Sequence, residues 1–412
     1  MLARFADYLE RTWEFSQVVE SLEDSRLYPK VPASAIFLSL FGMFATRLPS
    51  LNALEGELRL PRRWEPWVGP RKPSADTLGY ALDRSNLKRL RSKLVWINHQ
   101  MKRKKILRSH SPPYFVAALD GHELFSSFKR CCNKCLMRKI ETNKGKAIQY
   151  YHRVAVLQII DARPSLILDI EPVLPGEGEV AAAERLLDRA RKLYPRFFDV
   201  ISADALYLGA PFIKKVKAWG WDVIVVLKQE NRDLYQDANG LLAITPSQEF
   251  QKDNIAGRRW NLEKLVTWSQ LGRPIRAVVE QYQENRRERI AGQWRETVVD
   301  HHWRWVTTLS GSLFTGAQVS RWGHARWDIE NRGFNDLASH WAMDHCFHHH
   351  PTAILACLLI LAMAFVLTRV FFERNLKPQF KLRLNLTRMA LARLFFDDLA
   401  KQWTGSFWAH PP

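Results

Sequence analysis

Two aspartates stand where carboxylates can do metal-dependent chemistry. Asp120 closes the segment YFVAALD and precedes Gly121, and Asp204 closes the segment DVISAD. Both segments have the composition of short buried β-strands. Carboxylates at the ends of neighbouring strands can converge at one edge of a sheet, where their oxygens form a site for hard cations. Taken singly, either aspartate is better explained as a turn or helix cap.

A third acid, Glu330, lies in the segment RWGHARWDIENRGFNDLASHW. On a helix, Arg326, Glu330 and Phe334 fall on a single face. The plain alternative is an intrahelical Arg–Glu pair beside a core phenylalanine. Trp322 and Trp327 bracket the approach to Glu330. An exposed indole can stack on an unpaired base, whereas a buried one belongs to the core.

The segment CCNKC at 131–135 is a candidate for a metal site of another kind. Cys132 and Cys135 have the two-residue gap of half a zinc knuckle. Cys131, His122 and His152 are the candidates to complete a structural Zn²⁺ site. The alternative is a set of reduced thiols without metal.

A second group of metal-binding side chains occurs in DHCFHHH near the C-terminus. His345 and His349 have helical spacing and can bind metal together. The alternative is a solvated helix end before Pro351.

The charge balance indicates a polyanionic partner. Lys and Arg number 61 against 42 Asp and Glu, a formal net charge of +19. Neutralising phosphates releases condensed counterions, so such an excess favours nucleic acid over a merely soluble basic protein or an acidic membrane. The 16 Trp and 10 Tyr add stacking surfaces. In the basic helix expected around 89–108, the DNA-binding candidates are Lys102, Arg103, Lys104 and Lys105.

The compartment expected is the cytoplasm. Five cysteines in 412 residues are an odd number that fits a reducing environment. The N-terminus has no signal-peptide apolar core. Residues 352–368 are nearly all apolar, at the short edge of a membrane span. We expect a buried core helix there, and no membrane partner.

Periodicity divides the chain into four parts. Residues 1–112 are expected to be helical, up to the break at Pro112 and Pro113. Residues 113–240 alternate strands and helices, 241–315 form a β-rich insertion that looks separate, and 316–412 are helical. The expected strands are 114–120, 150–160, 165–173, 197–204 and 221–228, with helices at 178–194 and 210–220. This order predicts an α/β fold with a mixed sheet.

Three motifs in order carry a family resemblance. LDGHE at 119–123, SADALY at 202–207 and RWDIENRGFNDL at 326–337 resemble the motifs of prokaryotic insertion-sequence transposases of the DDE class. The branch is the one with a β-strand insertion between the second Asp and the Glu. KPSADTLGYAL is similar to the end of the N-terminal domain of that branch. The resemblance covers roughly residues 30–370.

The resemblance implies a ribonuclease H-like catalytic domain, split by the insertion and preceded by a helical DNA-binding or accessory domain. Asp120, Asp204 and Glu330 would be catalytic and would hold two Mg²⁺ ions, for which Mn²⁺ substitutes. Asp120 would bridge both ions, and Arg326 would steady Glu330 or a DNA phosphate. The implied reaction is cleavage at element ends followed by strand transfer. The implied partners are terminal inverted repeats, target DNA and a second copy of the chain.

Two positions depart from the family pattern. Gly323 stands where the branch has a Tyr, and Leu337 stands where it has a Lys. Both family side chains are thought to contact DNA phosphate, so the details of end-binding are the part in doubt. Two alternatives stay open from the sequence: a metal-dependent nuclease of the same fold, and an inactive or domesticated DNA-binding derivative.

Overall fold

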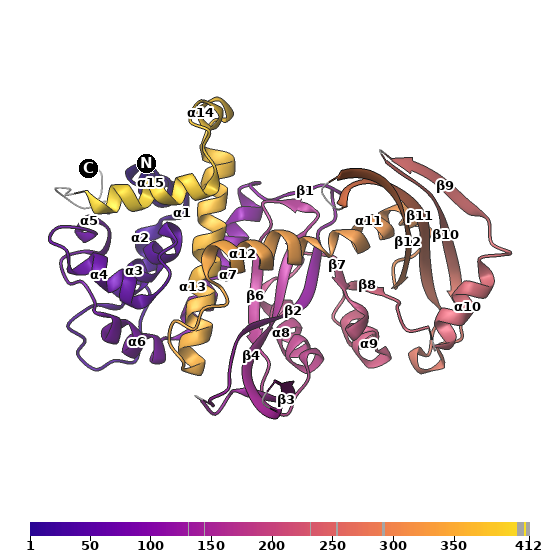
Figure 1. Cartoon of the computed structure of the whole chain (residues 1–412), viewed down its shortest axis with the longest axis horizontal. Helices are drawn as coiled ribbons and strands as arrows, with labels where there is room; N and C mark the ends of the chain where they lie inside the picture. The colour runs from indigo at the N-terminus through magenta and orange to yellow at the C-terminus, as the bar shows by residue number, and fades with distance from the viewer. Residues whose placement is uncertain are drawn as a thin grey trace.

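A computed structural model gives the fold of the chain (Figure 1). The structure describes residues 1–130, 132–143, 145–230, 232–252, 254–290, 293–401 and 408. A helical N-terminal region lies at one end and the insertion strands lie at the other, with the mixed sheet between them (Figure 1). Apolar side chains from all three regions join one continuous core.

The N-terminal region is helical, as predicted. Its helices are α1 (Leu2–Trp13), α2 (Phe15–Glu20), α3 (Ala33–Thr46), α4 (Leu51–Arg59), α5 (Glu65–Val68), α6 (Ala75–Asp83) and α7 (Leu87–Arg103). Side-chain oxygens of Ser50, Ser74 and Asn86 accept backbone N–H groups at the starts of α4, α6 and α7. These caps satisfy donors that have no partner within the helix.

The central sheet has the predicted ribonuclease H-like arrangement. Its strands are β2 (Val116–Ser127), β4 (Gly145–Ile160), β6 (Ile167–Pro172), β7 (Val200–Ala203) and β8 (Asp222–Val226). They lie in the order β6-β4-β2-β7-β8, antiparallel among the first three and parallel from β2 to β8. Helix α8 (Glu179–Leu193) packs against β4 and β6, and α9 (Ala210–Ala218) packs against β8. The α/β prediction is confirmed.

Three short strands were not predicted. β3 (Leu136–Thr142) forms a hairpin with the first half of β4, and β1 (Arg108–Ser109) pairs with β5 (Ala162–Arg163). The hairpin carries the CCNKC segment at its base, in the connection from β2 to β3.

The insertion is part of the same sheet. It consists of α10 (Asp233–Leu241), β9 (Ser247–Lys252), β10 (Ile255–Leu265), η2 (Ser269–Leu271), β11 (Ile275–Ile290) and β12 (Gln293–Thr307). The expectation of a separate unit was wrong, because the end of β12 pairs antiparallel with β8, Trp305 opposite Val226. Such pairing joins residues about eighty positions apart and leaves no local signal in the sequence.

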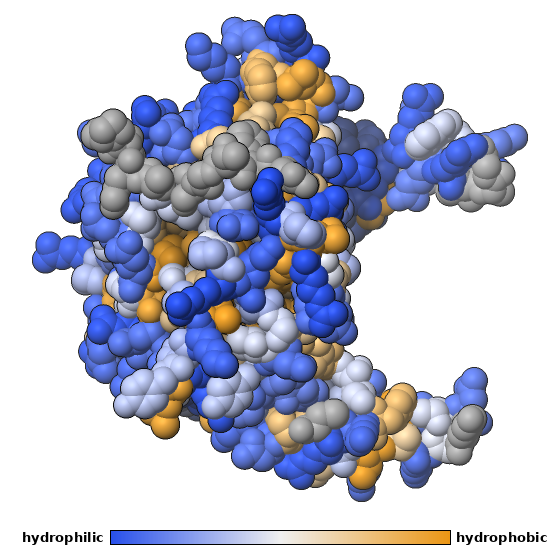
Figure 2. Space-filling view, turned by 90° about the vertical axis from the view of Figure 1, so that its left-hand side faces the viewer, coloured by the Kyte–Doolittle hydropathy of each residue, from blue (hydrophilic) through white to orange (hydrophobic). Residues whose placement is uncertain are grey.

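The C-terminal part is helical, as predicted. Its elements are α11 (Gly316–Ala325), η3 (Glu330–Phe334), α12 (Asn335–Trp341), α13 (Pro351–Val370), η4 (Phe371–Asn375), α14 (Pro378–Arg383) and α15 (Arg388–Ala400). Helix α13 packs against α3, α6, α7 and β6. It is the one described helix long and apolar enough to cross a membrane, and 94% of its apolar window is buried. Because it is buried, this apolar segment is a core helix, as expected. The face of the molecule in Figure 2 is mostly hydrophilic, with scattered hydrophobic patches.

Candidate active site

Strand register places the two aspartates side by side. The parallel ladder between β2 and β7 ends at the pair Leu119 and Ala203, and Asp120 and Asp204 are the next residues of the two strands. The prediction that Asp120 closes its strand was wrong. Strand β2 continues past it along the long antiparallel partner β4, with Asp120 opposite Val156. The convergence survives this correction, since it depends only on the end of the parallel ladder.

Backbone amides fix the orientation of both carboxylates. Oδ1 of Asp120 accepts the N–H of Gly121 at 2.8 Å. Oδ1 of Asp204 accepts the N–H of Leu206 at 2.9 Å and so caps the short helix η1 (Ala205–Tyr207). The second oxygen of Asp120, Oδ2, accepts from Arg326.

Glu330 reaches the aspartates through a break in its helix. Helix α11 ends at Ala325, and Glu330 begins a π-helical turn that ends at Phe334. Single π-turns inside helices recur at functional sites. Nη1 of Arg326 donates both to Asp120 Oδ2 at 2.8 Å and to Glu330 Oε1 at 2.9 Å. One nitrogen thus holds carboxylates of β2 and of the π-turn together.

The carboxylates raise one another's affinity for positive charge. Burial raises the pKa of Asp120 from 3.8 to about 6, and the charges of Asp204 and Glu330 add to the rise, while Arg326 opposes it. A cluster of carboxylate oxygens with this excess of negative charge suits Mg²⁺ or Mn²⁺, which prefer oxygen ligands. The donor set fits a hard divalent cation.

A comparison with known families decides the class. A family model described as the transposase DDE domain matches residues 126–367, more than half of the chain. The chain belongs to this family of transposases. Members act on DNA and generally use divalent metal ions. Asp204 and Glu330 lie inside the matched segment, and Asp120 lies shortly before it. No match was found among the curated proteins.

The transposase has a fourth carboxylate in this region that the sequence did not predict. Glu179, the first residue of α8, is buried, accepts the hydroxyl of Tyr207 at 2.7 Å and pairs with Arg153 at 2.6 Å. A Cβ at Gly121 would lie only 1.8 Å from its Oε2. The glycine after Asp120 therefore makes room for Glu179. That glycine was the available signal in the sequence.

Trp322 cannot stack on a DNA base, contrary to its place among the DNA-binding candidates. Its side chain is fully buried. Its indole Nε1 donates to Ser111 Oγ at 3.1 Å and to Asp161 Oδ2 at 3.2 Å. Helical spacing did not separate it from Trp327, which is 46% exposed and is the indole available at the surface.

Arg326 also differs from the predicted phosphate contact. Its side chain is 6% exposed and turned inward to the carboxylates. Of the two roles expected for it, the contact with Glu330 is the one present.

The basic run at the end of α7 is only partly available to a partner. Lys102 Nζ donates to the backbone oxygens of Arg196 and Phe197, both at 2.8 Å, and Lys104 donates to the oxygen of Thr12. Lys102 therefore helps to dock α7 on the catalytic domain, which corrects its assignment as a DNA contact. Arg103, Lys104 and Lys105 are exposed.

Only some of the expected zinc ligands come together. Cys132, Cys135 and His152 converge, whereas Cys131 lies outside the described residues. His122 was wrongly included: its Nε2 contacts Asp344 Oδ1 at 2.6 Å and its ring stacks on Phe334. Strand alternation turns it toward the helices of the C-terminal part.

The helical pairing by which His345 and His349 could bind metal together does not form. The segment between α12 and α13 is not helical, so the two side chains do not share a face. Nε2 of His349 lies 3.5 Å from Cys135 Sγ, whereas the ring of His345 packs edge-on against that of Phe347.

The two departures from the family pattern have a packing reason. Gly323 faces Trp305, and a Cβ there would lie 2.3 Å from the indole Nε1. Leu337, in α12, is buried in the core. Neither position can present a long polar side chain to DNA in this arrangement.

This packing gives a stability prediction. Gly323→Ala should destabilise the protein by about 1–3 kcal/mol, because the added methyl group overpacks the contact with Trp305. Gly56→Ala, in helix α4 with open space around the new Cβ, is the matched control and should stabilise it by about 0.5–1 kcal/mol. Chemical denaturation measures both changes. Equal effects of the two substitutions would contradict the overpacking at Trp305.

The raised pKa of Asp120 gives a pH prediction for protein without added Mg²⁺. The pKa is about 6 in the folded protein and 3.8 in the unfolded chain. The folded state therefore holds more protons in that window, and stability falls as the pH rises through it. Asp120→Asn removes this decline, so its Tm advantage over wild type should grow between about pH 4 and pH 7. Over this window the free energy of unfolding of the variant should rise, relative to that of wild type, by at most about 3 kcal/mol.

The control for that measurement is Asp188→Asn. The side chain of Asp188 is 45% exposed, and hydrogen bonds from Arg191 and Lys192 lower its pKa. Its variant should show no growing advantage over the same window. A Tm difference between Asp120→Asn and wild type that stays constant with pH would show that the carboxylate is not strained by its neighbours.

Proposed function

We propose that the chain is a DNA transposase that cleaves at the ends of its element and joins the released 3′ ends to target DNA. Asp120, Asp204 and Glu330 hold two Mg²⁺ ions, for which Mn²⁺ substitutes. The observation that carries the proposal is the convergence of these carboxylates from β2, the end of β7 and the π-turn, linked by Arg326. The family match supports the reaction class.

When bound, the two ions stabilise the attacking and leaving oxygens of an in-line phosphoryl transfer. Asp120, Asp204 and Glu330 would hold the ions, and Asp120 feels the negative charges of both of the others. Their fixed orientations mean that little reorganisation is needed at the moment of reaction.

Arg326 and Glu179 act as positioning residues. Arg326 keeps Glu330 directed at Asp120 from a buried position. Glu179 supports the backbone behind Asp120 through its contact with Gly121, and Tyr207 and Arg153 hold Glu179 in place. Substitution of either residue changes the geometry of the triad without removing a ligand.

The partners proposed are the terminal inverted repeats, target DNA and a second copy of the chain in the synaptic complex, in the cytoplasm at the nucleoid. The net charge of +19 supports a polyanionic partner. Exposed arginines on the β11–β12 hairpin add to the basic surface at the end of α7; they are Arg286, Arg287, Arg289 and Arg295. Figure 2 shows a hollow between two projections of the molecule, a shape that can accept a duplex.

A plasmid assay separates this function from its alternatives. DNA that carries the element's own end is incubated with a target plasmid, Mg²⁺ and the purified protein. End-to-target joined products are expected. Cut ends without joined products would instead indicate a nuclease, and bound but uncut DNA would indicate a derivative that only binds.

A further inference from the structure

A tight cluster of sulfur and nitrogen atoms lies away from the three carboxylates. Its members are Cys132 and Cys135 in the connection from β2 to β3, His152 on β4, and His349 just before α13. Each offers one atom, and all four atoms lie within 4.8 Å of one another. Residues more than two hundred positions apart in the chain thus meet at one point.

The distances match a tetrahedral metal site. Cys132 Sγ lies 3.6 Å from Cys135 Sγ, each sulfur lies 3.5 Å from His152 Nε2, and the two imidazole Nε2 atoms are 3.1 Å apart. A tetrahedral zinc ion with ordinary bond lengths places two sulfurs about 3.8 Å apart and two nitrogens about 3.3 Å apart. A disulfide requires about 2.05 Å between the sulfurs, so the two thiols are not joined.

We propose that Cys132, Cys135, His152 and His349 bind one structural Zn²⁺ ion. Two thiolates and two imidazoles select a borderline-soft cation over Mg²⁺, which prefers oxygen ligands. Four protein ligands close the coordination sphere, which is typical of a structural site and leaves no position for substrate.

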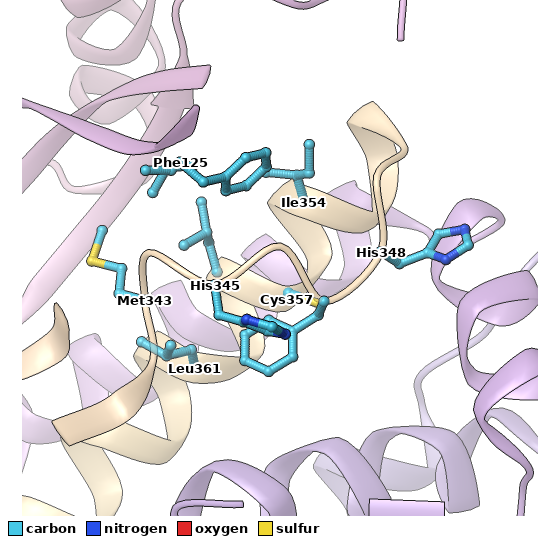
Figure 3. Close-up of a pocket in the computed structure, with 10 residues that line it drawn as sticks. Phe125, Met343, His345, His348, Ile354, Cys357 and Leu361 are labelled. Atoms are coloured by element: carbon cyan, nitrogen blue, oxygen red, sulfur yellow. The ribbon is translucent and has the colours of Figure 1, made fainter. Parts of the chain in front are cut away.

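The surroundings hold the ligands in place. The ring of Phe125 lies 5.3 Å from that of His152 and 5.4 Å from that of His349. Figure 3 shows Phe125 beside Ile354 of α13, in the apolar pocket under the segment that carries His349. The ring of His152 also packs at 5.1 Å from that of His349, and His152 is buried.

The neighbouring histidines are engaged elsewhere. Oδ1 of Asp83 lies 3.1 Å from Nε2 of His348 and 3.3 Å from Nδ1 of His350. His122 contacts Asp344. Among the histidines of 345–350, all of which the structure describes, His349 is the one that joins the cluster.

A zinc ion at this point would connect the part of the catalytic domain before the insertion to the part after it. His349 follows the π-turn that begins with Glu330 and helix α12 after it, and His152 lies on β4, the strand paired with the one that carries Asp120. Zinc would therefore tie the connection from α12 to α13 onto the sheet. The contact between His122 and Asp344 ties the same connection to β2. Loss of the metal should loosen the support of Glu330 without touching a carboxylate.

The test is the metal content and coordination of the full-length protein. Elemental analysis should give about one zinc per chain, and zinc X-ray absorption should give two sulfurs at about 2.3 Å and two nitrogens at about 2.0 Å. This second measurement needs no variant, so it holds even if the variants fail to fold. Protein without zinc, a Cys132–Cys135 disulfide, or a shell with oxygen only would overturn the proposal.

Variants identify the fourth ligand. Cys135→Ser and His349→Ala should lose the zinc and lower the Tm, because a structural ion contributes directly to folding. His122→Ala and Cys346→Ser are the matched controls and should keep about one zinc per chain. Zinc that persists in His349→Ala but is lost in His122→Ala would overturn the ligand set.

Discussion

Glu330→Gln should lower the rate of DNA cleavage by several orders of magnitude while the fold and DNA binding stay nearly unchanged. The substitution keeps the shape of the side chain and removes a negative charge from the proposed metal site, whose main contribution is charge stabilisation. Asp120→Asn and Asp204→Asn should behave alike, and the effects of the three substitutions should not add, because ligands of one site act as a unit. The measurement is cleavage of end-bearing DNA with Mg²⁺, beside a gel-shift assay.

The chain contains a matched control for this prediction. Glu373 also lies in a π-turn and also accepts from an arginine four residues earlier, Arg369 Nε at 2.9 Å. If Glu330 were only such a partner of Arg326, its loss would cost a few tenths of a kcal/mol of helix stability. Glu373→Gln should therefore leave cleavage unchanged. A Glu330→Gln protein that binds and cleaves like Glu373→Gln would remove Glu330 from the site.

The second large effect is the salt dependence of DNA binding. A chain of net charge +19 that binds six or more phosphates should weaken about 10³–10⁵-fold in affinity between about 50 and 200 mM salt. Replacing Arg103, Lys104 and Lys105 together with Gln should flatten the log–log slope by about 0.9 for each phosphate that these side chains neutralise in the wild type. Titrations at several salt concentrations measure the slope.

The control neutralises Arg59 and Arg62, which are exposed at and just after the end of α4. Because the slope reports the number of neutralised phosphates and not the net charge, this pair should leave it unchanged. Equal slopes for wild type and the triple variant would place the DNA surface elsewhere, and the exposed arginines of the β11–β12 hairpin would then be the next to test.

Features that depend on local pattern were predictable from the sequence. The five central strands were predicted because β-branched and aromatic residues bounded by turns carry a local signal. Asp120 and Asp204 were placed together because parallel neighbours end at one edge. The core helix at Pro351–Val370 also follows from a short segment. These predictions needed no knowledge of distant contacts.

Features that depend on distant pairing were not predictable. The extension of β2 beyond Asp120 is set by β4, and the junction of the insertion with the sheet is set by the end of β12. Helical spacing did not distinguish Trp322 from Trp327. Trp322 is buried by distant residues that pack against it, Tyr114, Asp161 and Phe314.

The metal ligands show the same limit. Cys132 and Cys135 carry a spacing signal, but His349 reaches them only because α13 packs across the central sheet at β6. His122 was nearer in sequence and has no part in the cluster. For Glu179, the sole signal was the glycine after Asp120, which has meaning only once the two segments are seen to touch.

The central claim is that the three carboxylates form a divalent-metal site for DNA cleavage. The most direct measurement is the rate of cleavage of end-bearing DNA as a function of Mg²⁺ concentration, for wild type and for Asp204→Asn. Wild type should be inactive without added divalent ion and should gain activity that saturates with Mg²⁺, while Asp204→Asn should stay several orders of magnitude slower at every concentration. Cleavage by wild type without divalent ion, or an Asp204→Asn curve that overlays the wild-type curve, would contradict the account.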